Sequence, residues 1–368
     1  MFFVIGLAAG AWAPLAPFAK QRLALSDGAF GLALLCLGVG SILAMPLAGA
    51  LAARFGCRVV LVAGGIAIGL CFPLLALAPA APALAAALFL FGASLGSVDC
   101  VINMQAIVVE RRSGRPLMSG FHALYSLGGA AGAGAVSGLV GAGASPLVVT
   151  LAVGAIMLAA TLVARPGLRA ERGDAPGPMF ALPHGSVLLI GALCFVLFLV
   201  EGSALDWSAV LLRDQRQASP AQAGLAYAAF ATTMTVGRLV GDRVAAGLGL
   251  VRTVALGALV AAAGLATAAL APNWILSAGG YALVGAGCAN VVPALFTLTG
   301  RQRAMPEASA VAAVSVLGYA GILVGPAGIG LVANLAGLPL ALLAVAAMLL
   351  AVAAGATRLH PASAEAAA

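Results

Sequence analysis

Apolar runs of about twenty residues recur from one end of this chain to the other, and this pattern limits the possible folds. A helix of about twenty apolar residues crosses the hydrocarbon core of a bilayer. Because lipid offers no hydrogen bonds, only helices and closed barrels satisfy their backbone there. Barrels show short alternating segments instead of long apolar runs. The runs therefore predict an all-α membrane protein that crosses the bilayer many times.

Composition excludes the soluble and nucleic-acid-binding classes. The 368 residues are 63% hydrophobic and only 8% charged, with a mean hydropathy of +1.14. Soluble domains carry about 25% charged residues. The formal charge of +7 comes from Lys and Arg in short clusters between apolar runs, so no nucleic acid is expected as a partner. No phosphate-binding loop of the Gly-x-x-x-x-Gly-Lys type is present, which excludes direct use of ATP. We expect no cofactor and no metal.

The runs fall into two sets of six, separated by a polar segment. The predicted spans are 1–18, 29–52, 59–77, 83–109, 117–141, 146–164, 187–212, 221–240, 251–270, 274–299, 308–334 and 339–356. This predicts an N-terminal bundle (1–164), a linker (165–186), a C-terminal bundle (187–357) and a tail (358–368). Such internal symmetry is typical of transporters built from two related halves. Gly128 and Gly132 predict a close helix–helix approach in the fifth span.

The distribution of Lys and Arg predicts the orientation of the chain. With the N-terminus inside, the outer loops hold only Lys20, Arg22, Arg213 and Arg216, and the remaining basic clusters lie in inner loops and the tail. Basic residues are enriched in cytoplasmic loops. We therefore expect a multi-pass membrane protein with both termini in the cytoplasm.

Two polar residues in the fourth span share one helix face. Asp99 and Asn103 are four positions apart, so their side chains lie one above the other. A charged carboxylate at mid-span costs about 2.5–3.5 kcal/mol unless it is hydrated, paired or protonated. Asp99 is either a proton carrier or substrate contact, or the donor or acceptor of a structural bond to a neighbouring helix. Asn103 either contacts the substrate or forms a hydrogen bond to a neighbouring helix. Gln105 points away from this face.

Other ionisable groups lie within predicted spans. A His near a carboxylate can titrate around neutral pH, so His122 is a candidate for proton coupling with Asp99; a histidine bonded to backbone is the alternative. Glu201 lies deeper in the seventh span than Asp206, and we assign it a cavity or proton role. Five positions apart, these two acids project from different faces. Asp206 and Trp207 could form an outer gate, with Trp207 anchored at the interface.

A sugar site needs a flat ring for stacking together with amide and carboxylate partners for hydroxyl groups. Glu201, Asn103 and Asn290, which is in the middle of the tenth span, supply the polar partners. Trp12, Phe121 and Tyr125 supply the aromatic faces. The alternative is that these aromatic residues only pack between helices.

The turn between the second and third spans carries the most specific motif. Gly49, Arg54, Gly56 and Arg58 match the pattern Gly-x-x-x-Asp-Arg-x-Gly-x-Arg, but Ala53 replaces the acid. The corresponding turn after the eighth span, from Gly237 through Arg238 to Asp242 and Arg243, keeps its acid. With two six-span halves, the chain resembles the major facilitator superfamily. In that family these turns hold the cytoplasmic side closed when the transporter faces outward, which implies a weaker closure at Ala53.

Three segments resemble a bacterial branch near the fucose-type sugar permeases. They run over 99–110, 118–129 and 201–207. The resemblance implies a secondary active transporter of the bacterial inner membrane, not an enzyme. It would move a small solute such as a sugar by alternating access with protons, as a monomer in the lipid bilayer. Efflux of small hydrophobic compounds is the first alternative. A non-transporting sensor would need a sizeable soluble appendage, and an intramembrane enzyme would need converging catalytic groups; neither feature is apparent.

Overall fold

The structure of the chain is a computed structural model. It describes residues 1–12, 14–25, 27–170, 182–218, 222 and 225–359. Every regular element in these ranges is helical, and ten of the described helices are long and apolar enough to cross a bilayer. The predicted all-α class is confirmed.

The chain forms two compact units. Unit 1 contains residues 1–106, 124–181 and 306–312, and unit 2 contains residues 107–123, 182–305 and 313–368. The boundaries differ from a simple division into halves because three long helices contribute to both units. These helices are α5 (Ala81–Ser113), α6 (Met118–Gly141) and α14 (Glu307–Ala336).

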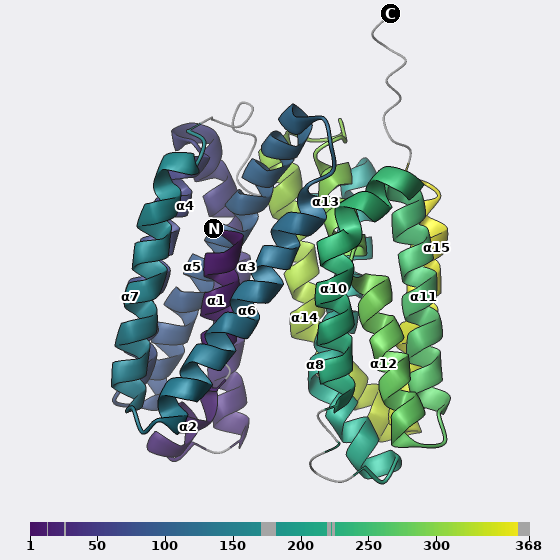
Figure 1. Ribbon diagram of the computed structural model, residues 1–368, viewed down its shortest axis with the longest axis horizontal. Coiled ribbons are helices and arrows are strands. Elements are labelled where there is room, and N and C mark those ends of the chain that lie inside the picture. The colour runs from purple at the N-terminus through teal and green to yellow at the C-terminus, as the bar shows by residue number, and fades with distance from the viewer. Residues whose placement is uncertain (13, 26, 171–181, 219–221, 223–224, 360–368) are drawn as a thin grey trace, which may run out of the picture. The chain divides into compact units, whose positions relative to one another are not determined.

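Unit 1 is built from most of the helices of the first half of the chain. Besides its parts of α5 and α6, it contains α1 (Phe2–Trp12), α2 (Ala16–Arg22), α3 (Asp27–Phe55), α4 (Cys57–Leu77), α7 (Pro146–Ala164) and the 3-10 turn η1 (Arg165–Gly167). Helices α4 and α7 pack along each other, and α1 contacts both of them (Figure 1). The first predicted span is therefore two helices, with Pro14 between them, because proline lacks the N–H that continues the helical ladder.

Unit 2 contains most of the second half. Its helices are α8 (Gly185–Val210), continued by the π-helical turn η2 (Leu211–Gln215), then α10 (Leu225–Leu248), α11 (Leu250–Leu270), α12 (Trp274–Cys288), α13 (Val291–Thr299) and α15 (Leu338–Ala356). Helix α11 packs against α12 and α15, and α10 also packs against α12 (Figure 1). The tenth predicted span is thus divided, with Ala289 and Asn290 between its two helices.

Single glycines, not charged loops, separate several of these helices. The predicted turn over 49–58 is mostly helical, because α3 continues to Phe55 and only Gly56, with φ 88°, precedes α4. The charged loop predicted around Asp242 is wrong for the same reason: α10 continues to Leu248 and ends at Gly249, with φ 80°. Charged residues leave the apolar pattern without ending a helix. Glycine ends it because it adopts positive φ at little cost.

The fourth predicted span is also longer than expected, since α5 continues past Val109 to Ser113 and includes Glu110. The second bundle begins at Gly185. Most of the predicted linker and tail, residues 171–181 and 360–368, lies outside the described residues.

Glycines bring α1 and α6 together within unit 1. A Cβ on Gly128 would meet the carbonyl oxygen of Phe3 and would lie 2.9 Å from the amide nitrogen of Leu7. A Cβ on Gly132 would lie 2.9 Å from the amide nitrogen of Ala11. Small residues allow such backbone contact between membrane helices, and the predicted close approach at Gly128 and Gly132 is confirmed.

This contact gives a matched pair of substitutions in one helix. We expect Gly128→Ala to lower the free energy of unfolding by about 1–3 kcal/mol, the usual cost of overpacking. A Cβ on Gly134 meets nothing within 4 Å, so Gly134→Ala should be neutral or stabilise by up to about 1 kcal/mol through helix propensity. Unfolding in detergent measures both variants, and equal midpoints would contradict the packing argument.

Candidate functional site

A buried ion pair joins α8 and α10 in unit 2. Nη2 of Arg238 lies 3.6 Å from Oε1 of Glu201, and the two side chains are 7% and 20% exposed. Nε of Arg238 also donates to the carbonyl oxygen of Ala289, 3.4 Å away. Burying two charges costs several kcal/mol per ion before their attraction compensates. Such a pair in a membrane protein marks a functional position more often than a structural one.

The break between α12 and α13 lies next to this pair. Nδ2 of Asn290 donates to the carbonyl oxygen of Gly237, 3.2 Å away, which is the residue before Arg238. Oδ1 of Asn290 is buried and accepts no hydrogen bond from the described residues. Interrupted helices supply backbone carbonyls at the binding sites of many transporters. The break therefore presents polar groups at the ion pair, and Asn290 and Glu201 converge on consecutive residues of α10.

His122 belongs to the same unit. It lies in the first turns of α6, is 8% exposed, and its ring centroid is 6.0 Å from that of Phe296. Phe121, beside it in the chain, is half-buried. Asp99 belongs to unit 1, so coupling between His122 and Asp99 stays a prediction.

Asp99 and Asn103 lie on one face of α5, as predicted. Nδ2 of Asn103 donates to the backbone carbonyl of Asp99 at 2.9 Å and lies 3.5 Å from its Oδ1. Asn103 is only 1% exposed, and its Oδ1 is buried and accepts no hydrogen bond from the described residues. Gln105 faces elsewhere and donates to the carbonyl of Arg169. Unit 1 therefore holds a carboxylate and an unused amide oxygen side by side.

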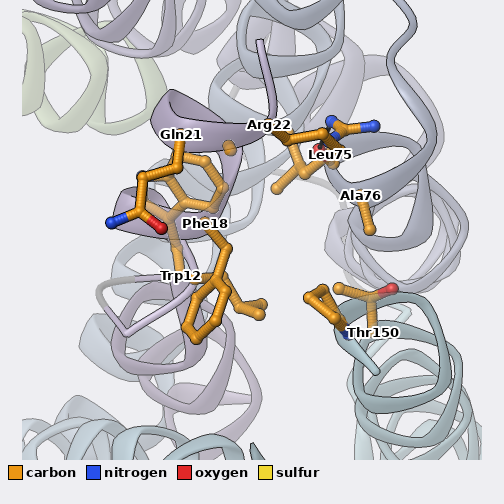
Figure 2. Close-up of a pocket in the computed structure, with 10 residues that line it drawn as sticks. Trp12, Phe18, Gln21, Arg22, Leu75, Ala76 and Thr150 are labelled. Atoms are coloured by element: carbon orange, nitrogen blue, oxygen red, sulfur yellow. Dashed lines mark hydrogen bonds between the residues drawn. The ribbon is translucent and has the colours of Figure 1, made fainter. Parts of the chain in front are cut away.

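Trp12 lines a cavity of about 250 Å³ in unit 1. The lining residues are Trp12, Leu15, Phe18, Ala19, Gln21, Arg22, Leu75, Ala76, Pro146 and Thr150. Figure 2 shows Trp12 and Phe18 together on one side of the cavity and Leu75, Ala76 and Thr150 on the other. Asn103 is not among these residues. Tyr125 does not line this cavity either; its carbonyl oxygen would meet a Cβ on Gly6.

Two carboxylates bind the N-terminus of α6 in unit 2. Oε2 of Glu110 accepts from the N–H groups of Leu117 (2.8 Å) and Met118 (2.9 Å). Asp242 accepts from Ser119 through Oδ1 (2.9 Å) and from Gly120 through Oδ2 (3.0 Å). The first N–H groups of a helix have no partner within it, and negative charge is favourable there. The acids therefore satisfy four consecutive donors, and α10 is joined to α6 at Asp242.

The other predicted gating residues have varied surroundings. Arg58 donates to the carbonyl of Leu168 at 2.6 Å, beside the start of the predicted linker. The guanidinium carbon of Arg54 lies 5.2 Å from the ring centroid of Phe55. Asp206 is exposed on α8, and Arg243 is exposed on α10.

Glycines mark the places of two further gating candidates. A Cβ on Gly49 would lie 3.3 Å from the carbonyl oxygen of Ala308, so α3 and the first turns of α14 approach closely within unit 1. Trp207 is half-buried on α8 and lies against Gly330 of α14.

Sequence reasoning missed the partners of these groups. The sequence motif places Arg238 in the turn after the eighth span, and only the structure shows its pairing with Glu201. An arginine four positions before Asp242 in an apolar helix was the available signal, because a buried cation needs a counter-charge. The bond from Thr297 to Glu110 had no comparable signal.

The amino-acid sequence is similar to those of three bacterial membrane proteins. The chain is 49% identical over 356 residues to an uncharacterized MFS-type transporter of Yersinia pestis, covering 96% of this chain and 93% of that protein. It is 33% identical to an uncharacterized transporter of Sinorhizobium fredii, covering 91% and 90% of the two chains. It is also 31% identical to the membrane protein MosC of Rhizobium meliloti, covering 94% and 85%. No family model matches the chain.

Solved structures show the same fold. The E. coli fucose:proton symporter FucP has a TM-score of 0.80 at 17% identity, covering 98% of this chain and 96% of that chain. The proton:xylose symporter XylE has a TM-score of 0.78 at 13% identity, covering 97% and 93%. The long apolar helices and the relatives named as transporters indicate the same class of protein. The chain belongs to the major facilitator superfamily of membrane transporters.

Proposed function

We propose that the chain is a proton-coupled secondary transporter that takes up a small polar solute, a sugar or a related metabolite, by alternating access. The observation that carries the proposal is the buried pair of Glu201 and Arg238 beside the break between α12 and α13. A carboxylate at this position exchanges its ionic partner for a proton without leaving the bundle. That exchange is the elementary step that proton coupling requires.

The ion pair behaves as a two-state element in this proposal. When Glu201 is charged, it attracts Arg238 and fixes α8 against α10. When Glu201 takes up a proton, this attraction is lost and Arg238 keeps the carbonyl of Ala289 as a partner. A conformational equilibrium shifts only if the proton binds one state more tightly than the other. The loss of the pair provides that difference, and the fold neighbours named as symporters of protons with fucose or xylose support it.

The unused polar atoms support a solute rich in hydroxyl groups. Oδ1 of Asn103 and Oδ1 of Asn290 are buried acceptors with no hydrogen-bond donor among the described residues. A buried polar group without a partner costs about 1–3 kcal/mol. A solute that donates hydrogen bonds would recover this cost, which favours a polyol or sugar over an aromatic drug.

The cellular setting follows from the charge pattern. Basic residues gather in the loops that we assign to the cytoplasm, so we place both termini there and the protein in the inner membrane. We take a single copy of the chain as the working unit. The relatives are named as transporters, and nothing in the structure supports the sensor alternative.

Efflux of small hydrophobic compounds is the second candidate function. The observation that favours it is the cavity at Trp12, whose lining is mostly apolar. In that case the cavity of unit 1 would contact the compound.

Thermal unfolding of the purified protein against sugars, organic acids, amino acids and cationic drugs tests the proposal. A ligand that binds only the folded state raises the melting temperature by mass action. We expect a sugar or related metabolite to stabilise the protein, and more strongly at about pH 5.5 than at about pH 7.5. Stabilisation by drugs alone would overturn the uptake proposal in favour of efflux.

Asp99→Asn tests whether the carboxylate of unit 1 also carries the proton. Asn keeps the shape of Asp99 and one acceptor oxygen, but it cannot be charged. We expect uphill uptake into proteoliposomes driven by a proton gradient to be lost, while exchange of labelled for unlabelled substrate continues. Asp214→Asn, an exposed acid in η2, is the matched control. Unchanged uphill uptake by Asp99→Asn would remove Asp99 from the proton path.

A further inference from the structure

A second cavity lies in unit 2 and has a volume of about 200 Å³. Neither Glu201 nor Arg238 is among its lining residues. It is formed by the end of α5, the loop before α6 and the end of α13. The lining residues are Ile107, Glu110, Arg111, Gly114, Arg115, Pro116, Thr297, Gly300 and Arg301. Three of these residues are exposed arginines, from two segments that are distant in the sequence.

The single acid in this cavity is already bonded. Oε2 of Glu110 accepts from two backbone N–H groups, and its Oε1 accepts from the hydroxyl of Thr297 at 2.6 Å. Three cations and one carboxylate leave a lining charge of +2. The carboxylate is thus used by the protein, and the described lining keeps an excess of positive charge, to which Arg115 and Arg301 contribute.

The wall of the cavity is held in place by backbone contacts. Nη2 of Arg111 donates to the carbonyl oxygen of Gly300 at 2.6 Å, which joins α5 to the end of α13. Gly300 lies so close to Ile107 that a Cβ would overlap its side chain. Gly114 has φ +67°, a conformation that glycine adopts easily, and it makes the turn that sets Arg115 in the same lining as Arg111.

We propose that this cavity binds a phosphate group, carried either by the head group of an anionic lipid or by a soluble phosphate compound. Guanidinium groups match phosphate oxygens with paired hydrogen bonds. Basic pockets between membrane helices on the cytoplasmic side bind anionic lipid head groups. The expected orientation of the chain places the loops with Arg115 and Arg301 on that side. The proposal depends on neither the transported solute nor proton coupling.

A phosphate bound in this cavity would lie next to the N-terminus of α6. The cavity includes Pro116, and the next two residues donate to Glu110. A phosphate held by Arg115 and Arg301 would join the loop before α6 to the end of α13. Such a ligand should therefore stabilise this junction and raise the melting temperature of the protein by mass action.

The test compares two arginines of one loop in the purified full-length protein. Arg301 lines the cavity, whereas Arg303 is also exposed and does not line it. Calorimetry in neutral detergent would use three probes: short-chain phosphatidylglycerol, short-chain phosphatidylcholine as the neutral lipid, and inorganic phosphate. A basic residue near a membrane surface contributes about 1 kcal/mol to anionic lipid binding, or about fivefold in affinity.

We expect Arg301→Gln and Arg115→Gln each to weaken binding of phosphatidylglycerol or phosphate about fivefold, while Arg303→Gln keeps the affinity of the unmodified protein. Binding of the lipid alone would identify a head-group site, and binding of both probes a general phosphate site. Equal losses in all three variants would show diffuse surface charge and overturn the proposal. Binding of phosphatidylcholine as tight as that of phosphatidylglycerol, or no binding of either anionic probe, would also overturn it.

Discussion

Arg238→Met is expected to lower the free energy of unfolding by about 3–5 kcal/mol, the range for breaking a buried ion pair by removing one partner. Methionine fills a similar volume but leaves the carboxylate of Glu201, only 20% exposed, without its cation. It also leaves the carbonyl of Ala289 without the donor that Arg238 supplies. Unfolding in detergent at neutral pH measures the loss. Acidic pH should restore part of the stability, because a protonated Glu201 is neutral.

A double variant distinguishes the loss of stability caused by an unpaired charge from the loss caused by altered packing. Glu201→Gln with Arg238→Met has no buried charge at this position, so it should recover most of the stability that Arg238→Met loses. Replacing a buried ion pair by neutral residues is often nearly neutral in stability. If the single and double variants were equally unstable, the loss would come from packing and the ion pair would not be the cause. Each variant should also lose proton-driven uptake if Glu201 carries the proton.

Asp242→Ala is expected to release the start of α6 and to cost about 2 kcal/mol, at the upper end for loss of a helix cap. The substitution removes the acceptor of the N–H groups of Ser119 and Gly120. Their amide hydrogens should exchange faster with solvent, which hydrogen-exchange mass spectrometry of the peptide that contains them would detect. The variant loses both hydrogen bonds that join α10 to the start of α6. We therefore expect its transport rate to differ from that of the unmodified protein.

Asp214→Ala serves as the control for this variant, because Asp214 is an exposed aspartate in η2. It removes the same charge from the protein without removing a cap, so both the exchange of the α6 amides and the stability should stay unchanged. If Asp242→Ala left the exchange of Ser119 and Gly120 unchanged, Glu110 alone would suffice to hold this terminus.

The fold class could be predicted because it depends on local hydropathy. Long apolar runs must form helices in lipid wherever they occur, and the four-residue spacing of Asp99 and Asn103 places them on one helix face in any packing. The same spacing argument correctly separated Glu201 from Asp206, one of which is paired inside unit 2 while the other is exposed.

Helix ends were harder to predict, because hydropathy changes before a helix ends. Asp242 belongs to α10 although it interrupts the apolar pattern, and Glu110 belongs to α5 for the same reason. Each of these carboxylates is used at the terminus of another helix, α6. The residues next to Glu110 and Asp242 in the sequence do not indicate which backbone N–H groups these carboxylates bind.

The sequence by itself determined that this chain crosses the membrane as two sets of helices and which polar residues lie within them. The tertiary structure decided which of those residues meet. Glu201 pairs with Arg238, and Asn290 reaches the backbone of α10 because the tenth span is broken beside it. The physical reason is that hydropathy and helical period act within one segment, whereas the partner of a buried charge is chosen by the packing of helices that are distant in the chain.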